Sequence, residues 1–266
     1  MILLILLLLV SPVYGDLLNS RWEGLKGLWN LQEGGGVRVE DQSGNGAYGE
    51  VMNSASWVTG SHGNALSVGS TAKWVNIQAG SSTWVVSISS PFSVGGVFNR
   101  RPNADIGSGD VFMSNRESWP PNSAPGWHVY ETSFNSALRF GIAIGGGGTN
   151  GISTVRNDIV TDSYNDGRDH TFIVTYNGGN CIQCSKIYVD GEGGTQAKNT
   201  NDSTADSVPV AIQNAGDLHL GFFQGTIEFV GNIYSMFYFN RVLSPGEVKE
   251  ISNTLLKRNK KSRMIQ

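Results

Sequence analysis

The feature that most restricts the fold of this chain is the alternation of short strand-like runs with turns. About a dozen short apolar or alternating runs occur, and a cluster of turn-forming residues ends each of them. The runs are Leu25–Leu31, Ala65–Val68, Lys73–Ile77, Phe92–Phe98, Asp110–Met113, Trp127–Glu131, Ala137–Ile144, Val155–Val160, His170–Tyr176, Lys186–Val189, Asp217–Phe222 and Asn232–Phe239. Gly supplies 35 of the 266 residues, nearly double the usual ~7%. Glycine adopts the positive φ angles that tight turns require. This spacing predicts an all-β protein, built as a sandwich or a barrel.

Composition excludes several other classes. Hydrophobic residues make up 39% of the chain and aromatic residues 10%, which is too many for a disordered segment. Charged residues reach only 15% and the net charge is −3, so we expect no nucleic-acid partner. A coiled coil or a helical bundle would need far more charge and longer helical periodicity than this chain shows.

The two ends are expected to lie outside the fold. Residues Ile2–Val10 are continuously apolar, but a bilayer span needs ~20 such residues, so no stable membrane span is expected. Because Val13 and Gly15 then offer small residues for cleavage, residues 1–15 are predicted to be a secretory signal peptide, although no Lys or Arg precedes the run. The alternative is an apolar N-terminal arm. Residues 257–266 form a basic C-terminal tail, either solvated or docking an acidic partner.

The two cysteines, Cys181 and Cys184, have CxxC spacing. A structural zinc site needs four ligands, and the sequence has no second CxxC. The pair falls between two strand-like runs, so a disulfide that closes a hairpin loop is predicted if the protein is exported. Free thiols and a redox site are the alternatives.

Strand patterning predicts two packed sheets. Because strand side chains alternate between faces, Phe92, Val94 and Phe98 should share a buried face. The same alternation places four apolar residues on one face of a later run: Leu138, Phe140, Ile142 and Ile144. Strands that each bury one side are typical of a sandwich.

One short helix is predicted, from Pro245 to about Leu256. Ser244 is placed as its N-cap and Glu247 as the third helical residue, which together make a capping box. Pro245 fits the first helical position because its φ is already helical.

Three groups of segments in fixed order carry a family resemblance. They are Gly27–Gly36 with Glu40–Gly49, Trp57–Gly60 and Gly63–Leu66; Asp166–Gly178 with Lys186–Gly191; and Gly231–Tyr234 with Phe237–Ser244. This order resembles the concanavalin A-like lectin/glucanase superfamily, specifically the LamG-like domain related to laminin G and pentraxin domains. The resemblance implies an antiparallel two-sheet jelly-roll β-sandwich with one short C-terminal helix, which we assign to residues 16–256.

The superfamily includes glycoside hydrolases, so catalysis has to be considered. A retaining glycosidase needs two carboxyl groups about 5–5.5 Å apart, which an ExDxE-type strand could supply. No such strand occurs in the sequence. We therefore expect a non-catalytic protein, with a glycoside hydrolase as the least favoured option.

A structural calcium ion is the cofactor that the resemblance implies. Asp41 and Asn45 offer the hard oxygen ligands that calcium prefers. The family commonly has an acidic pair in the closing strand, whereas Tyr234 and Ser235 stand there in this chain. The loss of that pair weakens the calcium prediction.

The best sequence candidate for a ligand site is an aromatic and polar cluster around a Pro-rich loop. Trp119 and Trp127, together with Tyr130, could stack on sugar faces, and Asn115 and Arg116 could bond to hydroxyl groups. Proline fixes φ, so Trp119 would be held at little entropic cost. The alternative places Trp127 in the core.

The sequence thus favours a secreted or cell-surface module that binds carbohydrate or glycoprotein without catalysis. The rival interpretation is a structural or decoration protein of a virion or another extracellular assembly, whose partners would be other subunits.

Overall fold

The structure, a computed structural model, describes residues 22–53, 55–60, 63–68, 73–78, 90–101, 110–115, 126–134, 137–145, 152–157, 166–178, 184–196, 217–223 and 227–261. Sheet A contains β1 (Leu25–Trp29), β4 (Ser56–Gly60), β5 (Gly63–Val68), β7 (Phe92–Arg100), β12 (Asp169–Tyr176), β13 (Ser185–Val189), β14 (Glu192–Gln196) and β18 (Gly231–Phe239). Sheet B contains β2 (Arg38–Val39), β3 (Gly49–Met52), β6 (Trp74–Ile77), β8 (Asp110–Ser114), β9 (Gly126–Phe134), β10 (Ala137–Gly145), β11 (Ile152–Asn157) and β15 (Leu218–Leu220). A small ribbon, β16 (Phe222–Phe223) and β17 (Ile227–Glu228), and the helix α1 (Pro245–Lys261) complete the elements.

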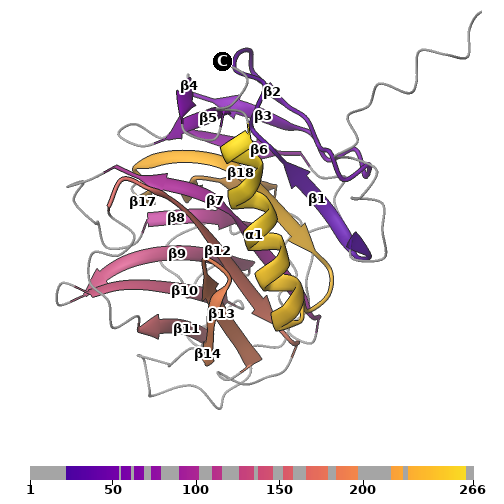
Figure 1. The fold of residues 1–266 in the computed structure, drawn as a ribbon, viewed down its shortest axis with the longest axis vertical. Helices are drawn as coiled ribbons and strands as arrows, with labels where there is room; N and C mark the ends of the chain where they lie inside the picture. The colour runs from indigo at the N-terminus through magenta and orange to yellow at the C-terminus, as the bar shows by residue number, and fades with distance from the viewer. Residues whose placement is uncertain are drawn as a thin grey trace, which may run out of the picture.

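The two main sheets are antiparallel throughout. Sheet A runs in the order β14-β13-β12-β7-β18-β5-β4, and β1 also pairs with β18. Sheet B runs in the order β11-β10-β9-β8-β15-β6-β3-β2. Figure 1 shows that the first and last strands, β1 and β18, lie side by side, so the two ends of the domain meet. The predicted all-β sandwich of two antiparallel sheets with a short C-terminal helix is confirmed.

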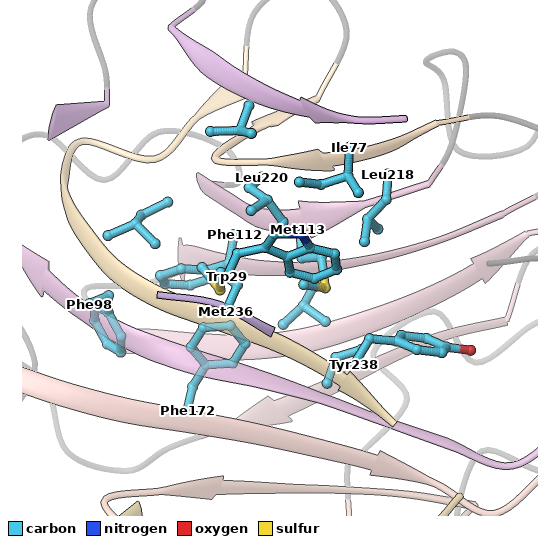
Figure 2. Packing of buried hydrophobic residues seen from close by; sticks show 14 of the residues in the cluster. Trp29, Ile77, Phe98, Phe112, Met113, Phe172, Leu218, Leu220, Met236 and Tyr238 are labelled. Carbon is cyan, nitrogen blue, oxygen red and sulfur yellow. The ribbon is translucent and has the colours of Figure 1, made fainter. Parts of the chain in front are cut away.

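The core lies between the two sheets. Figure 2 shows aromatic and aliphatic side chains of both sheets gathered there, with Phe98 and Phe172 from sheet A and Phe112 from sheet B. The Phe112 ring centroid lies 4.9 Å from that of Phe98 and 4.6 Å from that of Phe172. Burying a side chain of this size stabilises the fold by roughly 1.5–3 kcal/mol, so such contacts hold the sheets together.

Alternation along β7 agrees with the predicted strand faces. Phe92, Val94 and Phe98 are all fully buried and belong to the core between the sheets. Val97 points to the opposite face and packs in a second apolar cluster. For the other predicted face, on β10, the side chains of residues 138–144 lie outside the described ones.

The second apolar cluster fills the outer face of sheet A. Figure 1 shows α1 lying across this sheet. Val248, Ile251 and Leu255 of the helix belong to one cluster with Val97 and Ile173 of the sheet. Sheet A is therefore packed on both faces.

The helix begins with the predicted capping box. The Ser244 backbone N donates to Glu247 Oε2 at 2.7 Å, and the Glu247 backbone N donates to Ser244 Oγ at 3.3 Å. Arg241 adds a bond from Nη2 to Glu247 Oε1 at 2.6 Å. This bond from Arg241 lowers the pKa of Glu247 to about 2, since it and the capping bonds outweigh burial. The helix continues to Lys261, past the expected end near Leu256, so part of the predicted basic tail is helical.

Several short strands were not predicted from the sequence. They are β2, β3, β4, β14 and β17, which are two to five residues long. The predicted run Asp217–Phe222 is interrupted at Gly221, whose φ is +80°, and divides into β15 and β16. Short strands such as these are stabilised by pairing with neighbours, and pairing is not visible in local patterning.

Within the described ranges, no helix has the length and apolar character needed to cross a bilayer. The predicted signal peptide, residues 1–15, and the last part of the tail, residues 262–266, lie outside those ranges.

Candidate functional site

Two of the predicted sugar-binding residues, Asn115 and Trp127, join the end of β8 to β9. Asn115 Oδ1 accepts a hydrogen bond from the Trp127 backbone N at 2.8 Å, and the Asn115 backbone N donates to the Trp127 carbonyl at 3.1 Å. The Trp127 side chain is fully buried, with its ring centroid 5.2 Å from that of Phe92. Trp127 therefore lies in the core and cannot act as a sugar platform, which corrects its predicted role and matches the alternative.

The other members of that cluster remain predictions. Arg116 and Trp119 lie outside the described residues. Tyr130 lies on β9, where it pairs with Val111 on one side and Gly141 on the other, and its side chain is outside the described ones.

Asp41, the first predicted calcium ligand, organises a turn. Its Oδ1 accepts hydrogen bonds from the backbone N of Leu28 at 3.1 Å and of Ser43 at 2.8 Å. Its Oδ2 accepts from the Ser43 hydroxyl at 2.8 Å and from the Ala47 backbone N at 3.0 Å. A carboxylate has about four lone-pair sites, so protein donors fill its bonding capacity.

Asn45, the second predicted ligand, belongs to the same turn. Its Nδ2 donates to the Leu25 carbonyl at 3.1 Å and to Ser43 Oγ at 2.8 Å. Calcium takes about 6–8 oxygen ligands. In the part of the chain that the structure describes, no three His, Cys, Asp or Glu residues gather as a metal set. Asp41 and Asn45 are thus bonded within the turn, and a calcium ion at this place stays a prediction.

The Cys184 sulfur takes part in a disulfide bond. Its predicted partner, Cys181, lies outside the described residues. The Asn177 backbone N donates to the Cys184 carbonyl at 2.9 Å, which ties together the two ends of the hairpin between β12 and β13. A bond from Cys181 to Cys184 within this loop stays a prediction.

A line of polar residues, the outer row, crosses sheet B on the face turned away from the core. Strand pairing connects Glu50 on β3 to Asn76 on β6, and Asn76 to His219 on β15. It continues from His219 to Ser114 on β8, and from Ser114 to His128 on β9. Because strand side chains alternate, these residues point away from neighbours that are buried in the core, namely Val51, Val75, Ile77, Leu218, Leu220, Met113, Trp127 and Val129.

Four residues in the middle of this face form a compact polar and aromatic group, which we call the outer-face site: Trp74, Asn76, Asp217 and His219. Asn76 Nδ2 donates to Asp217 Oδ2 at 2.8 Å. The rings of Trp74 and His219 meet edge to face, with their centroids 4.5 Å apart. Trp74 and Asn76 are two residues apart on β6, so they share the outer face.

Two polar atoms of the outer-face site have no hydrogen-bond partner. They are Asn76 Oδ1 and His219 Nδ1, both shielded from solvent. Burial lowers the pKa of His219 to about 4, although the negative charge of Asp217 opposes this shift. His219 is therefore neutral at neutral pH, and a neutral imidazole has one donor and one acceptor nitrogen.

Two described acids lie in or beside the site: Asp217 bonds to Asn76, and Glu50 pairs with Asn76 across the strands. Arg38, which pairs with Glu50 at the edge of the sheet, is engaged by Glu40 through Nε and Oε1 at 2.5 Å. The Arg38 guanidinium also lies over the Tyr48 ring, 4.3 Å from its centroid. Arg38 is thus engaged by Glu40 and Tyr48 at the edge of the sheet.

A second histidine has a structural environment. His170 Nδ1 lies 2.8 Å from Asp190 Oδ2, and His170 Nε2 lies 3.1 Å from Asp166 Oδ1; these three residues form the His170 cluster. Burial acts to lower the pKa of His170, but the bonds and charges of the two carboxylates outweigh it and raise the pKa. Asp190 Oδ1 also accepts from the Thr171 backbone N at 2.8 Å. The cluster therefore connects a turn and a hairpin to the start of β12.

Sequence reasoning missed the outer-face site. The run Lys73–Ile77 was recognised as a strand, and its alternation already places Trp74 and Asn76 on one polar face. What could not be foreseen is the pairing of this strand with β15, because Asn76 and Asp217 are 141 residues apart.

The fold and the outer row together define a two-sheet β-sandwich with a helix packed on one sheet and a polar, partly aromatic face on the other. No protein-family model and no curated protein matches the sequence. Solved structures do match the fold.

The chain is similar to the binding domain of Paraclostridial Mosquitocidal Protein 1, with a TM-score of 0.64 and 14% identity over 88% of this chain and 53% of that one. It is also similar to the botulinum neurotoxin serotype G binding domain, with a TM-score of 0.62 and 14% identity over 86% of this chain and 51% of that one. The chain thus spans about half the length of these two domains.

A third similar structure is domain 4 of AbnA, an extracellular GH43 arabinanase from Geobacillus stearothermophilus, in complex with arabinotriose. Its TM-score is 0.55, with 15% identity over 86% of this chain and 98% of that one. These likenesses show a two-sheet β-sandwich fold. The LamG-like assignment within it stays a prediction.

Proposed function

We propose that this chain is a non-catalytic recognition module that binds a glycan or a glycoprotein outside the cell. The observation that carries the proposal is the outer-face site, where the half-buried indole of Trp74 packs against His219, next to the hydrogen bond from Asn76 to Asp217. An aromatic ring with adjacent polar atoms is the arrangement that sugar recognition uses, because one sugar face is apolar and its edge carries hydroxyl groups.

The comparisons support this proposal through the fold. The matching domain of AbnA was solved with arabinotriose, and the two toxin domains are named as binding domains. A binding role for this fold is therefore consistent with what these proteins do.

The experiment is a glycan array probed with the full chain, followed by calorimetry on the glycans that bind. We expect binding to at least one glycan and no cleavage of it on prolonged incubation. Trp74→Ala should weaken binding, and Trp119→Ala tests whether the Pro-rich loop contributes as the sequence predicts. If the array shows no glycan bound, the proposal is wrong; if bound oligosaccharides are hydrolysed, the non-catalytic part is wrong.

A further inference from the structure

The His170 cluster joins two turns through one imidazole ring, whose capacity to donate hydrogen bonds depends on pH. We propose that the cluster is a proton-operated latch: the charged imidazolium of His170 ties the turn at Asp166 to the hairpin turn at Asp190, and loss of its proton releases Asp166. This role is separate from glycan binding and involves none of the outer-face residues.

Both ring nitrogens of His170 meet acceptor atoms. Nδ1 lies 2.8 Å from Asp190 Oδ2, and Nε2 lies 3.1 Å from Asp166 Oδ1. An ionised carboxylate can only accept a hydrogen bond, and a neutral imidazole has only one N–H to donate. The two contacts can therefore be hydrogen bonds at the same time only when both ring nitrogens carry a proton.

Asp190 is the fixed side of the latch. It lies in the tight turn between β13 and β14, and its backbone N donates to the Thr171 carbonyl at 3.0 Å. Its Oδ1 accepts from the Thr171 backbone N at 2.8 Å. These bonds to β12 keep the carboxylate beside the ring at any pH, so we expect the single proton of the neutral ring to stay on Nδ1.

Asp166 is the side that is released. Besides the ring, its Oδ1 accepts from the Arg168 backbone N at 2.8 Å, a bond that lies within the same turn and moves with it. When His170 loses its proton, the lone pair of Nε2 faces Oδ1, and two acceptors repel each other. Asn99 Nδ2 still donates to the Gly167 carbonyl at 2.7 Å, which confines the movement to the Asp166 end of the turn.

The two carboxylates set the direction of the titration. Burial acts to lower the pKa of His170, but its bonds and charge interactions with Asp190 and Asp166 outweigh this effect and raise the pKa. Burial acts to raise the pKa of Asp166, but the bonds from the Arg168 backbone and from His170 outweigh it and lower the pKa. Asp166 is therefore ionised throughout the range in which His170 titrates.

Other charges lie on the elements around the ring. Among the described side chains they are Arg168 in the turn, Asp169 on β12, Arg100 on β7, Glu192 on β14 and Lys249 on α1. Asp169 Oδ1 accepts from Asn99 Nδ2 at 2.8 Å, and Glu192 Oε1 lies 2.8 Å from Lys249 Nζ. The positive charges of Arg168 and Arg100 act against protonation of the ring, but the side chain of Arg168 is 83% exposed and screened by water.

The test follows the His170 ring of the full chain by nitrogen-15 NMR from pH 5.5 to pH 9. Nuclear Overhauser contacts between the ring protons and the Cβ protons of residue 166 report whether the latch is closed. We expect these contacts at the acidic end of the range and their loss at the same midpoint as the ring titration. The neutral ring should carry its proton on Nδ1.

Two variants of the released side should behave differently. In Asp166→Asn, the amide can offer its oxygen to the charged ring or its NH₂ group to the neutral Nε2, so the contacts should persist at every pH while the pKa of His170 falls below that of the wild type. Asp166→Ala should lose the contacts at every pH. Glu50→Gln, which removes an exposed acid from sheet B, is the matched control and should titrate like the wild type.

Contacts that persist in the wild type after His170 has titrated would overturn the latch, and so would their loss at a different midpoint. A neutral ring protonated on Nε2, or an Asp166→Asn variant that still opens with pH, would overturn it as well. The decisive measurements are made on the wild type, so they do not depend on whether a variant folds.

Discussion

Removal of the Asp41 carboxylate should cost a large part of the stability of the domain, because the first turn is built around it. In Asp41→Ala, four hydrogen bonds are lost, three of them from backbone N–H groups. The N–H group of Ser43 can reach water, since this residue is half-buried. The N–H groups of Leu28 and Ala47 belong to buried residues. Two donors left unpaired at about 1–3 kcal/mol each give a loss of about 4 kcal/mol in the free energy of unfolding.

This loss is measurable by urea unfolding followed through tryptophan fluorescence. Trp29 is a local reporter, because its buried indole Nε1 donates to the Ala47 carbonyl at 2.7 Å. Asp41→Asn keeps one acceptor oxygen and should lose about half as much free energy. The control is Glu192→Ala, which removes the same charge from an exposed ion pair with Lys249 and should leave the midpoint unchanged.

The reasoning would be refuted if Asp41→Ala lost less than about 1 kcal/mol, the value of a single ordinary hydrogen bond. If Asp41 bound calcium, as the family resemblance predicts, calcium would raise the unfolding midpoint of the wild type and a chelator would lower it. With the lone pairs of Asp41 filled by protein donors, we expect neither change.

Three further perturbations test other parts of the fold. Folding raises the pKa of His170, so the charged imidazole stabilises the folded state. This stabilisation is fully present below about pH 6.5, the pKa of an unperturbed histidine, and is lost as the pH rises through the raised pKa of the folded state. The thermal midpoint of the wild type should therefore decline from pH 6 to pH 8. An equally steep decline in His170→Gln would contradict this. Ser244→Ala should lose about 1 kcal/mol in chemical unfolding, and Ser244→Asp should restore it, because the N-cap of α1 needs an oxygen acceptor. Gly96→Ala should lose about 2–3 kcal/mol, because its Cβ would press on the Met236 sulfur and on a strand carbonyl. Gly35→Ala, which meets nothing within 4 Å, is its control, and equal losses in the two variants would refute the steric argument.

Local chemistry made much of the fold predictable. The alternation of Phe92, Val94 and Phe98 correctly identified a core face, because period two is imposed by strand geometry itself. The start of α1 was predicted from Ser244 and Glu247, since a capping box acts within four residues. Both depend only on neighbours in the chain.

The candidate site was much less predictable. Trp127 looked like a ligand platform, but strand pairing and packing place it in the core. Trp74 and Asn76 looked like part of an ordinary strand. Their importance appears only when β15 brings Asp217 and His219 beside them, because a hydrogen-bond partner 141 residues away leaves no local signal.

The sequence alone thus determined the class of fold. Strand periodicity, turn glycines and helix capping depend only on residues that are close together in the chain. The tertiary structure alone decided which polar groups are satisfied and which are not. In the sequence, Asp41 was a candidate calcium ligand, and Asn76 was one polar residue of a predicted strand. Folding surrounds the carboxylate of Asp41 with donors and leaves the Asn76 oxygen without one, because burial and partners are properties of the packed chain.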